Sequence, residues 1–221
     1  MNNILTVASF DIGKKNFSFC VEEFDRSSLN EIKTTFPRKR FNLDGSPTVI
    51  FDEMIKACFN NGKIILLENV DLTKDCEQID KKFNNEWLYN MNNLLDKYSE
   101  IFTKCSVILI ETQMAFGSRI NFTALKLAQH CCSYFTLKFP KGTIEIVDFP
   151  AYNKTRALGA VKSLVKTKPQ RKKWCITKAK QILESRNLDH DFLLKINESK
   201  KKDDLCDVIC QLQAWKIIVT I

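Results

Sequence analysis

An uninterrupted apolar run, SVILI at residues 106–110, is the feature that most limits how this chain can fold. Apolar runs without polar alternation are typical of strands that other elements cover on both faces. A second apolar run spans residues 3–11 and ends in Asp-Ile-Gly, which predicts a buried strand that stops at a turn. Both runs therefore indicate strands inside a covered sheet.

The order of the other patterns predicts the kind of sheet. Residues 16–24 alternate partially, and residues 29–42 allow a third strand with unclear edges, so two hairpin-like steps open the chain. Residues 71–85 are expected to be a loop, and the basic residues 150–172 a surface segment with some helix. Further strands are expected at 63–67 and 143–149, and helices at 48–60, 86–104, 119–138, 171–187 and 202–219. Strands first, then alternating helices and strands, predict an α/β sheet with an antiparallel front half.

Length and composition favour one domain over residues 1–221. The chain is 44% hydrophobic, which is enough for a packed core, and it contains neither an internal repeat nor a clean linker. No apolar run approaches the roughly 18 residues of a membrane helix, and residues 1–10 lack the basic start of a signal peptide. The nine cysteines form no CxxC pair and there are only two histidines, so we expect reduced thiols in a cytosol-like compartment and no zinc site.

The basic charge is concentrated in one stretch. The net charge is +8, and residues 141–202 hold 16 Lys/Arg against 6 Asp/Glu, which is 16 − 6 = +10. The rest of the chain therefore carries 8 − 10 = −2. Such a distribution fits a polyanionic partner that contacts the C-terminal half.

Four acids stand at the ends of predicted elements. Asp11 closes the first strand, Glu111 closes SVILI, and Asp204 and Asp207 open the last helix. Strand ends of α/β sheets are where ligands bind, and positions i and i+3 of a helix can face one site. Carboxylates bind hard cations such as Mg²⁺, and two cations about 3.5–4 Å apart can stabilise both oxygens of a phosphodiester that is being cut. In the last helix these acids lie beside an expected apolar stripe of Leu205, Val208, Ile209, Leu212 and Trp215.

Each acid also has an ordinary structural explanation. Asp204 and Asp207 can offset the helix macrodipole, with Asp203 as a cap or bystander. Asp11 can belong to an Asp-Gly-type turn and Glu111 to a solvated strand end, so the functional interpretation depends on their joint occurrence. Glu68 closes the similar run KIILLE and competes with Glu111 for the same role.

Aromatic and basic residues in the C-terminal half suggest contacts with a nucleic acid. Lys172 and Lys173 can offset charge on a phosphate oxygen, or form a basic patch on the DNA backbone. Tyr152 and Trp174 could stack on unpaired bases, although Trp174 also suits the core.

Five segments resemble a known family. They are SFDIGKKNFSF, ILIETQMAFGSRINFTALKLAQHCCSYF, DFPAYNKTRALGA, RKKWCITKAKQIL and KKDDLCDVICQLQ. In this order they are similar to the Holliday junction resolvases of poxviruses and other large DNA viruses, which are related to bacterial RuvC and the fungal mitochondrial resolvases. The resemblance runs from about residue 7 to the C-terminus, whereas residues 25–105 match poorly and look expanded.

The resemblance implies an RNase H-like fold, with a central five-stranded mixed sheet of three antiparallel strands followed by parallel strands. It places two Mg²⁺ or Mn²⁺ ions per active site on Asp11, Glu111, Asp204 and Asp207, and it leaves open whether Asp203 replaces Asp204. Lys173, or its neighbour Lys172, becomes a catalytic lysine. The basic residues predicted to contact DNA are Lys14, Lys15, Arg119, Lys154, Arg156, Arg171 and Lys172.

The implied activity is that of a homodimeric crossover junction endodeoxyribonuclease, which nicks four-way DNA junctions symmetrically during viral recombination, repair and concatemer resolution. We expect recognition of junction shape and backbone, cytoplasmic viral replication factories as the location, and neither a small-molecule cofactor nor a membrane partner. Two alternatives remain: a broader nuclease acting on branched DNA, flaps or RNA–DNA hybrids, and a non-catalytic DNA-binding protein.

Overall fold

A five-stranded mixed sheet forms the centre of the computed structural model, which describes residues 3–35, 41–43, 46–76, 83–113, 120–186 and 189–220. The strand order is β3-β2-β1-β4-β5. β1 pairs antiparallel with β2 and β2 with β3, whereas β4 is parallel to both β1 and β5. The predicted antiparallel front half is therefore confirmed. The strands are Ile4–Asp11 (β1), Phe17–Asp25 (β2), Lys63–Val70 (β3), Val107–Glu111 (β4) and Glu145–Phe149 (β5).

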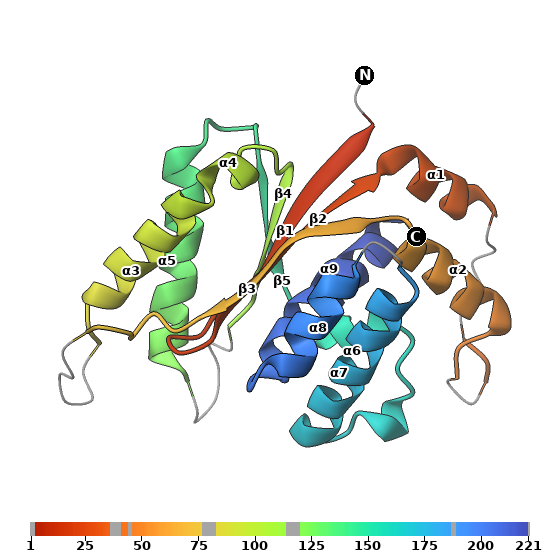
Figure 1. Cartoon of the computed structure of the whole chain (residues 1–221). Coiled ribbons are helices and arrows are strands. Elements are labelled where there is room, and N and C mark those ends of the chain that lie inside the picture. The colour runs from red at the N-terminus through yellow and green to blue at the C-terminus, as the bar shows by residue number, and fades with distance from the viewer. Residues whose placement is uncertain are drawn as a thin grey trace.

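Helices cover both faces of the sheet (Figure 1). One layer contains α3, α4 and α5, and the other contains α1, α2 and α6 to α9. The bounds are Arg26–Thr35 (α1), Val49–Asn60 (α2), Glu86–Lys97 (α3), Ser99–Phe102 (α4), Phe122–Lys138 (α5), Tyr152–Ala157 (α6), Lys168–Glu184 (α7), His190–Glu198 (α8) and Lys202–Thr220 (α9), with a 3₁₀ turn η1 at Lys162–Leu164.

Strand alternation divides the core in two. Successive side chains of a strand point to opposite faces. In β1, Val7 packs into the core beneath α9, whereas Ala8 and Phe10 pack into the core beneath α3 and α5. In β4, Val107 and Leu109 face the α9 side. Odd-numbered positions of both strands therefore face α9, which fixes where the last residue of each strand points.

The predicted last helix is confirmed and its five expected apolar residues lie in the core, but α9 is buried on nearly all sides and not along a single stripe. It packs between the sheet and the helices α6 and α7. Every residue from Leu205 to Ile217 except Asp207 is buried, including polar Gln211 and Gln213. A helix covered on all sides needs no polar face, and this is why a one-sided pattern fails here.

Two further expectations are corrected. The described part of 29–42 contributes no strand to the sheet; Arg26–Thr35 is a helix, and Asp25 accepts hydrogen bonds from the backbone N–H and the hydroxyl of Ser27 at its start. The third antiparallel strand is β3, which is longer than the predicted 63–67. The helix α8, His190–Glu198, was not predicted. Among the described residues, no helix is long and apolar enough to span a membrane.

Candidate active site

Asp11 and Glu111 end two neighbouring strands on the same face. β1 and β4 are parallel, and Phe10 pairs with Ile110, so the register continues to the two acids. Their odd numbering turns both side chains toward α9. The chain leaves β1 through a tight turn at Gly13, where a Cβ atom would lie 2.9 Å from the backbone oxygen of Asn16. A larger residue would disturb the turn that begins directly after Asp11.

α9 brings Asp204 and Asp207 over these strand ends. One turn after Asp207, the fully buried amide of Gln211 donates a hydrogen bond to the carbonyl oxygen of Phe10, at 3.2 Å. Phe10 directly precedes Asp11, so this contact fixes the helix against the end of β1. Sequence reasoning missed Gln211; a glutamine surrounded by apolar residues was the available signal.

Lys154 of α6 lies among the acids. Its ammonium is 3.3 Å from Oε1 of Glu111 and 3.8 Å from Oδ2 of Asp207, and its side chain is only 8% exposed. Burial lowers the pKa of Lys154, but the negative charges of Glu111, Asp207 and Asp11 outweigh it and hold the pKa above its usual range. Predicted only as a DNA contact, Lys154 is a buried cation inside the acid cluster.

The cluster is electrostatically strained because its acids are partly removed from water and close to each other. Burial, reinforced by the charge of Glu111, raises the pKa of Asp11 to about 8. Burial and the charges of Asp203 and Asp11 raise the pKa of Asp204 to about 6. The pKa of Asp207 is also raised by burial, against the influence of Lys154.

Lys172 and Lys173 occupy different environments. Lys172 forms an ion pair with Asp203, and this contact, together with Asp204 and Asp207, raises its pKa. Lys173 follows on α7 with an exposed side chain. The catalytic role predicted for Lys173 stays a prediction, and Lys172 is the lysine of this pair that contacts the acidic group.

Glu68 lies apart from the cluster. It pairs across the strands with Phe19, whose ring belongs to the core on the opposite face of the sheet. Its carboxylate forms an ion pair with Lys195 of α8 at 3.0 Å. The geometry therefore groups Glu111, and not Glu68, with Asp11.

The remaining predicted DNA contacts are spread around this end of the molecule. Lys14 and Lys15 are exposed in the β1–β2 turn, and the Lys14 ammonium lies 4.6 Å from the centre of the Trp87 ring. Arg156 is exposed on α6, and Arg171 donates to the carbonyl oxygens of Val165 and Lys166. Arg119 lies outside the described residues.

Two viral proteins are similar over almost the whole chain. Uncharacterized protein 170L of invertebrate iridescent virus 6 is 36% identical over 241 residues, covering 95% of this chain and 88% of the relative. Uncharacterized protein 97L of invertebrate iridescent virus 3 is 33% identical over 217 residues, covering 95% and 98%. This chain belongs to the family of these iridescent-virus proteins. No protein-family model matches the sequence.

Solved structures identify the fold of this iridescent-virus family. The fowlpox virus resolvase in complex with its substrate Holliday junction DNA has a TM-score of 0.54 and 16% identity, covering 97% of this chain and 99% of that one. The yeast mitochondrial Holliday junction resolvase Ydc2 has a TM-score of 0.52 and 16% identity, covering 96% and 78%. Thermus thermophilus RuvC has a TM-score of 0.50 and 8% identity, covering 97% and 95%. The chain has the RNase H-like fold of these resolvases, as its sequence predicted.

The donor set of this chain suits a hard divalent cation. Four carboxylates converge, and within the described part of the chain no group donates to the buried Oδ2 of Asp204. A dication would relieve the repulsion that raises the pKa of Asp11. Among those residues no three acidic, histidine or cysteine side chains already form a ligand set; the Lys154 ammonium bridges Glu111 and Asp207 instead. Metal binding therefore requires these side chains to shift.

Proposed function

We propose that this chain is a metal-dependent endonuclease that cuts four-way DNA junctions. The observation that carries the proposal is the convergence of Asp11, Glu111 and Asp207 around Lys154, at the strand ends of a fold shared with viral, mitochondrial and bacterial Holliday junction resolvases. Hydrolysis of a phosphodiester needs carboxylates that can hold metal ions and a positive charge close to the phosphate.

The reaction we propose is attack of water on a DNA phosphate. The oxygen of water forms a bond to phosphorus, the bond from phosphorus to the 3′ oxygen breaks, and the leaving 3′ oxygen takes a proton. The products are a 5′ phosphate and a 3′ hydroxyl, which a ligase can rejoin. Asp11, Glu111, Asp204 and Asp207 would hold two Mg²⁺ or Mn²⁺ ions, whose chemistry when bound is stabilisation of negative charge on the attacking and leaving oxygens.

The protein's own residues fix the geometry of this site. The register of β1 and β4 holds the carboxylates of Asp11 and Glu111 side by side, and Gln211 holds α9 against them. The Lys154 ammonium, which is buried and paired with two carboxylates, is positioned to place positive charge beside a phosphate oxygen. Lys172, paired with Asp203, lies on the α7 side of the same group.

Symmetric cutting of a junction requires two active sites, and we propose a homodimer in which each copy nicks one strand. The exposed basic residues Lys14, Lys15 and Arg156 surround this end of the molecule and would contact the phosphate backbone. Recombination or concatemer resolution of viral DNA, in cytoplasmic replication factories, is the setting that we propose for this activity.

A cleavage assay tests the proposal directly. Purified protein is incubated with a labelled synthetic four-way junction in Mg²⁺ or Mn²⁺, and with a flap, a linear duplex and an RNA–DNA hybrid of matched sequence. We expect paired nicks in opposite strands of the junction, and loss of cutting in Asp11→Asn. Failure of the wild type to cut the junction, or undiminished cutting by Asp11→Asn, contradicts the proposal. A hybrid or flap cut faster than the junction identifies a broader nuclease instead.

A further inference from the structure

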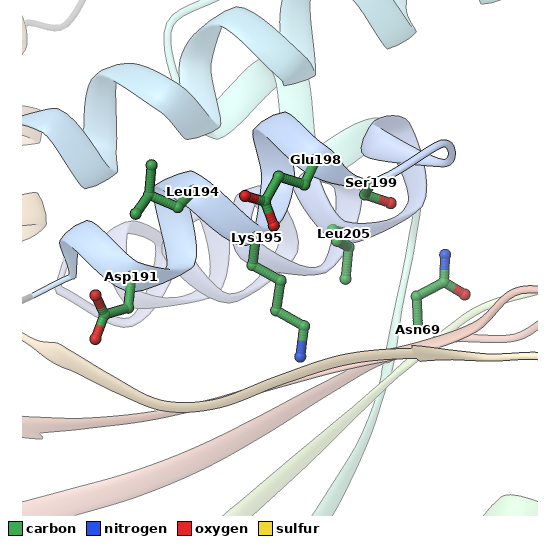
Figure 2. A pocket seen from close by; sticks show the side chains of 7 residues that line it. All are labelled: Asn69, Asp191, Leu194, Lys195, Glu198, Ser199 and Leu205. Atoms are coloured by element: carbon green, nitrogen blue, oxygen red, sulfur yellow. The ribbon is translucent and has the colours of Figure 1, made fainter.

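A pocket lies between α8 and the end of β3 (Figure 2). Its volume is about 500 Å³, and it is widely open to solvent. α8 contributes an apolar wall through Leu194, and Leu205 of α9 adds to it. The lining residues are Asn69, Asp191, Leu194, Lys195, Glu198, Ser199 and Leu205.

The sheet register places this pocket close to the scissile position. Asp11 pairs with Ser18, and Ser18 pairs with Asn69, so Asp11 and Asn69 share one row on the face that carries α9. Two strand spacings separate them, or about 10 Å. On the helix side, Leu205 directly follows Asp204. If a phosphate is bound at the acid cluster, the base of a neighbouring nucleotide can therefore reach the pocket.

The charge of the pocket excludes a phosphate but suits a base. Asp191 and Glu198 bring two carboxylates, whereas the single cation, Lys195, is engaged with Glu68 at 3.0 Å and with the carbonyl oxygen of Leu67 at 2.5 Å. A phosphate would meet an excess of negative charge. A neutral nucleobase can lie against the leucines, and its exocyclic amine can donate to a carboxylate or an amide oxygen.

A run of lysines lies between the pocket and the acids. Lys200 and Lys201 connect α8 to α9 and Lys202 begins α9, with Ser199 of the pocket on one side of this run and Asp203 on the other. Lys200 and Lys201 are exposed, and the backbone N–H of Lys201 donates to the Ser199 hydroxyl, which holds the turn together. The turn therefore presents cationic side chains where a DNA backbone would pass from the acids toward the pocket.

We propose that this pocket receives one unstacked nucleobase of the strand that is being cut, while Lys200–Lys202 contact the adjoining phosphates. The proposal rests on the proposed junction cleavage and adds a base-binding subsite to it. Bases at a branch point cost less to unstack than bases inside a continuous duplex. The carboxylates favour a base with an exocyclic amine over thymine, whose ring offers a single N–H donor.

The test uses the fluorescence of 2-aminopurine, a base analogue with an exocyclic amine that brightens when it leaves the stack. It is placed in turn at each nucleotide next to the crossover of a four-way junction. Fluorescence is measured on binding of the full chain without divalent metal, so that no strand is cut. We expect a several-fold rise at one or two positions in the strand that is cut when Mg²⁺ is added, and little change at matched positions in the arms.

Three variants separate the pocket from the rest of the surface. Leu194→Trp places a larger side chain in the pocket. Leu194 is 47% exposed, so the fold should tolerate the substitution. We expect it to abolish the fluorescence rise. Leu137→Trp, at an 87% exposed position on α5, is the matched control and should keep the rise. Glu198→Gln replaces one carboxylate oxygen by an amide nitrogen at an exposed position, and should reduce the preference for the amine-bearing base over thymine while Asp191 is unchanged.

The outcomes are distinguishable. A wild type that cuts junctions with no position-specific fluorescence rise overturns the base pocket alone. So does a rise that survives in a folded Leu194→Trp, or a base preference that Glu198→Gln leaves intact. A wild type that neither binds nor cuts junctions overturns the proposed function, and the subsite with it.

Discussion

The Lys154 ammonium lies 3.3 Å from the carboxylate of Glu111, although 40 residues of chain, 112–151, lie between β4 and α6. The lysine is buried and its positive charge is surrounded by acids. A residue that only contacts DNA would be exposed and free to move. Lys154 is instead a fixed positive charge among the acids that we propose to be catalytic.

Lys154→Met should abolish most of the cleavage. Loss of one preorganised group that stabilises transition-state charge costs on the order of 10²–10³ in rate, while junction affinity should change far less. The measurement is single-turnover cleavage at saturating protein, together with a binding titration. Lys173→Met, which alters an exposed lysine of α7, is the control. If Lys173→Met lost more activity than Lys154→Met, the catalytic lysine would be Lys173, as the family resemblance first suggested.

Glu111→Gln and Glu68→Gln should differ sharply. Both residues follow apolar runs, but only Glu111 lies beside Asp11 and Lys154, whereas Glu68 is paired with Lys195. Loss of one metal-binding carboxylate should reduce cleavage by about 10³ or more, which corresponds to roughly 4 kcal/mol in the transition state. Glu68→Gln should stay within a few-fold of the wild type. Equal losses in the two variants would show that the strand register does not decide which acid acts.

The metal-free protein should lose stability as the pH rises toward 8. The pKa of Asp11 is raised from 3.8 to about 8 by burial and by Glu111. When the pKa of a carboxyl group is higher in the folded protein than in the unfolded chain, the group stabilises the fold fully only below its pKa in the unfolded chain. This stabilisation is lost as the pH rises through the pKa of the folded protein. Asp204, whose pKa is raised to about 6, acts in the same direction.

Asp11→Asn should make this decline shallower, because the amide does not ionise. The difference between variant and wild type should reach several kcal/mol by pH 8, or roughly 10 °C in Tm, because one pKa unit corresponds to about 1.4 kcal/mol. Thermal unfolding in EDTA from pH 4 to pH 8 measures it. Mg²⁺ or Mn²⁺ should raise the Tm of the wild type more than that of the variant. A parallel decline in both proteins would show that Asp11 is already ionised without metal.

The apolar runs predicted the strands that end in Asp11 and Glu111, although a third strand was also expected at 29–42, where α1 extends to Thr35. That the two acids share one face depends on the register of β1 and β4, which their numbering alone does not determine. Local sequence patterns did not predict α1 and α8, because tertiary contacts determine whether these segments are helical. α1 begins at Asp25 and Ser27 in a stretch that alternation alone could not distinguish from a strand, and α8 is a short helix with one buried residue.

Lys154 and Gln211 show the same limit within the site. The neighbourhood of Lys154 in the sequence is basic, which suggests a DNA contact; its burial depends on how α6 packs against α9. Gln211 contacts Phe10 across 201 positions of sequence, a pairing that no local pattern encodes. The apolar sequence around Gln211 indicates burial, but the partners of both side chains are determined only when the helices pack on the sheet.

A second buried charged group, far from the acids, should control stability and not cleavage. Glu22 is fully buried and pairs with Arg186 at 3.1 Å and with Lys216 at 2.6 Å. Glu22 pairs with Val7 in the sheet, four residues before Asp11, which is roughly 13 Å along the strand. Burial alone would raise the pKa of Glu22, but Arg186 and Lys216 lower it, so the carboxylate is charged and the two cations depend on it.

Glu22→Gln should therefore destabilise the fold by about 3 kcal/mol, because it leaves the buried Lys216 without a carboxylate partner and Arg186 with Asp189 alone. For a chain of this length that corresponds to a fall of roughly 6–12 °C in Tm. Glu23→Gln, at the neighbouring and less buried position, should change Tm little. Cleavage by the folded Glu22→Gln protein, measured well below its Tm, should equal that of the wild type. A cleavage defect with an unchanged Tm would instead connect this charged group to the active site through the length of β1.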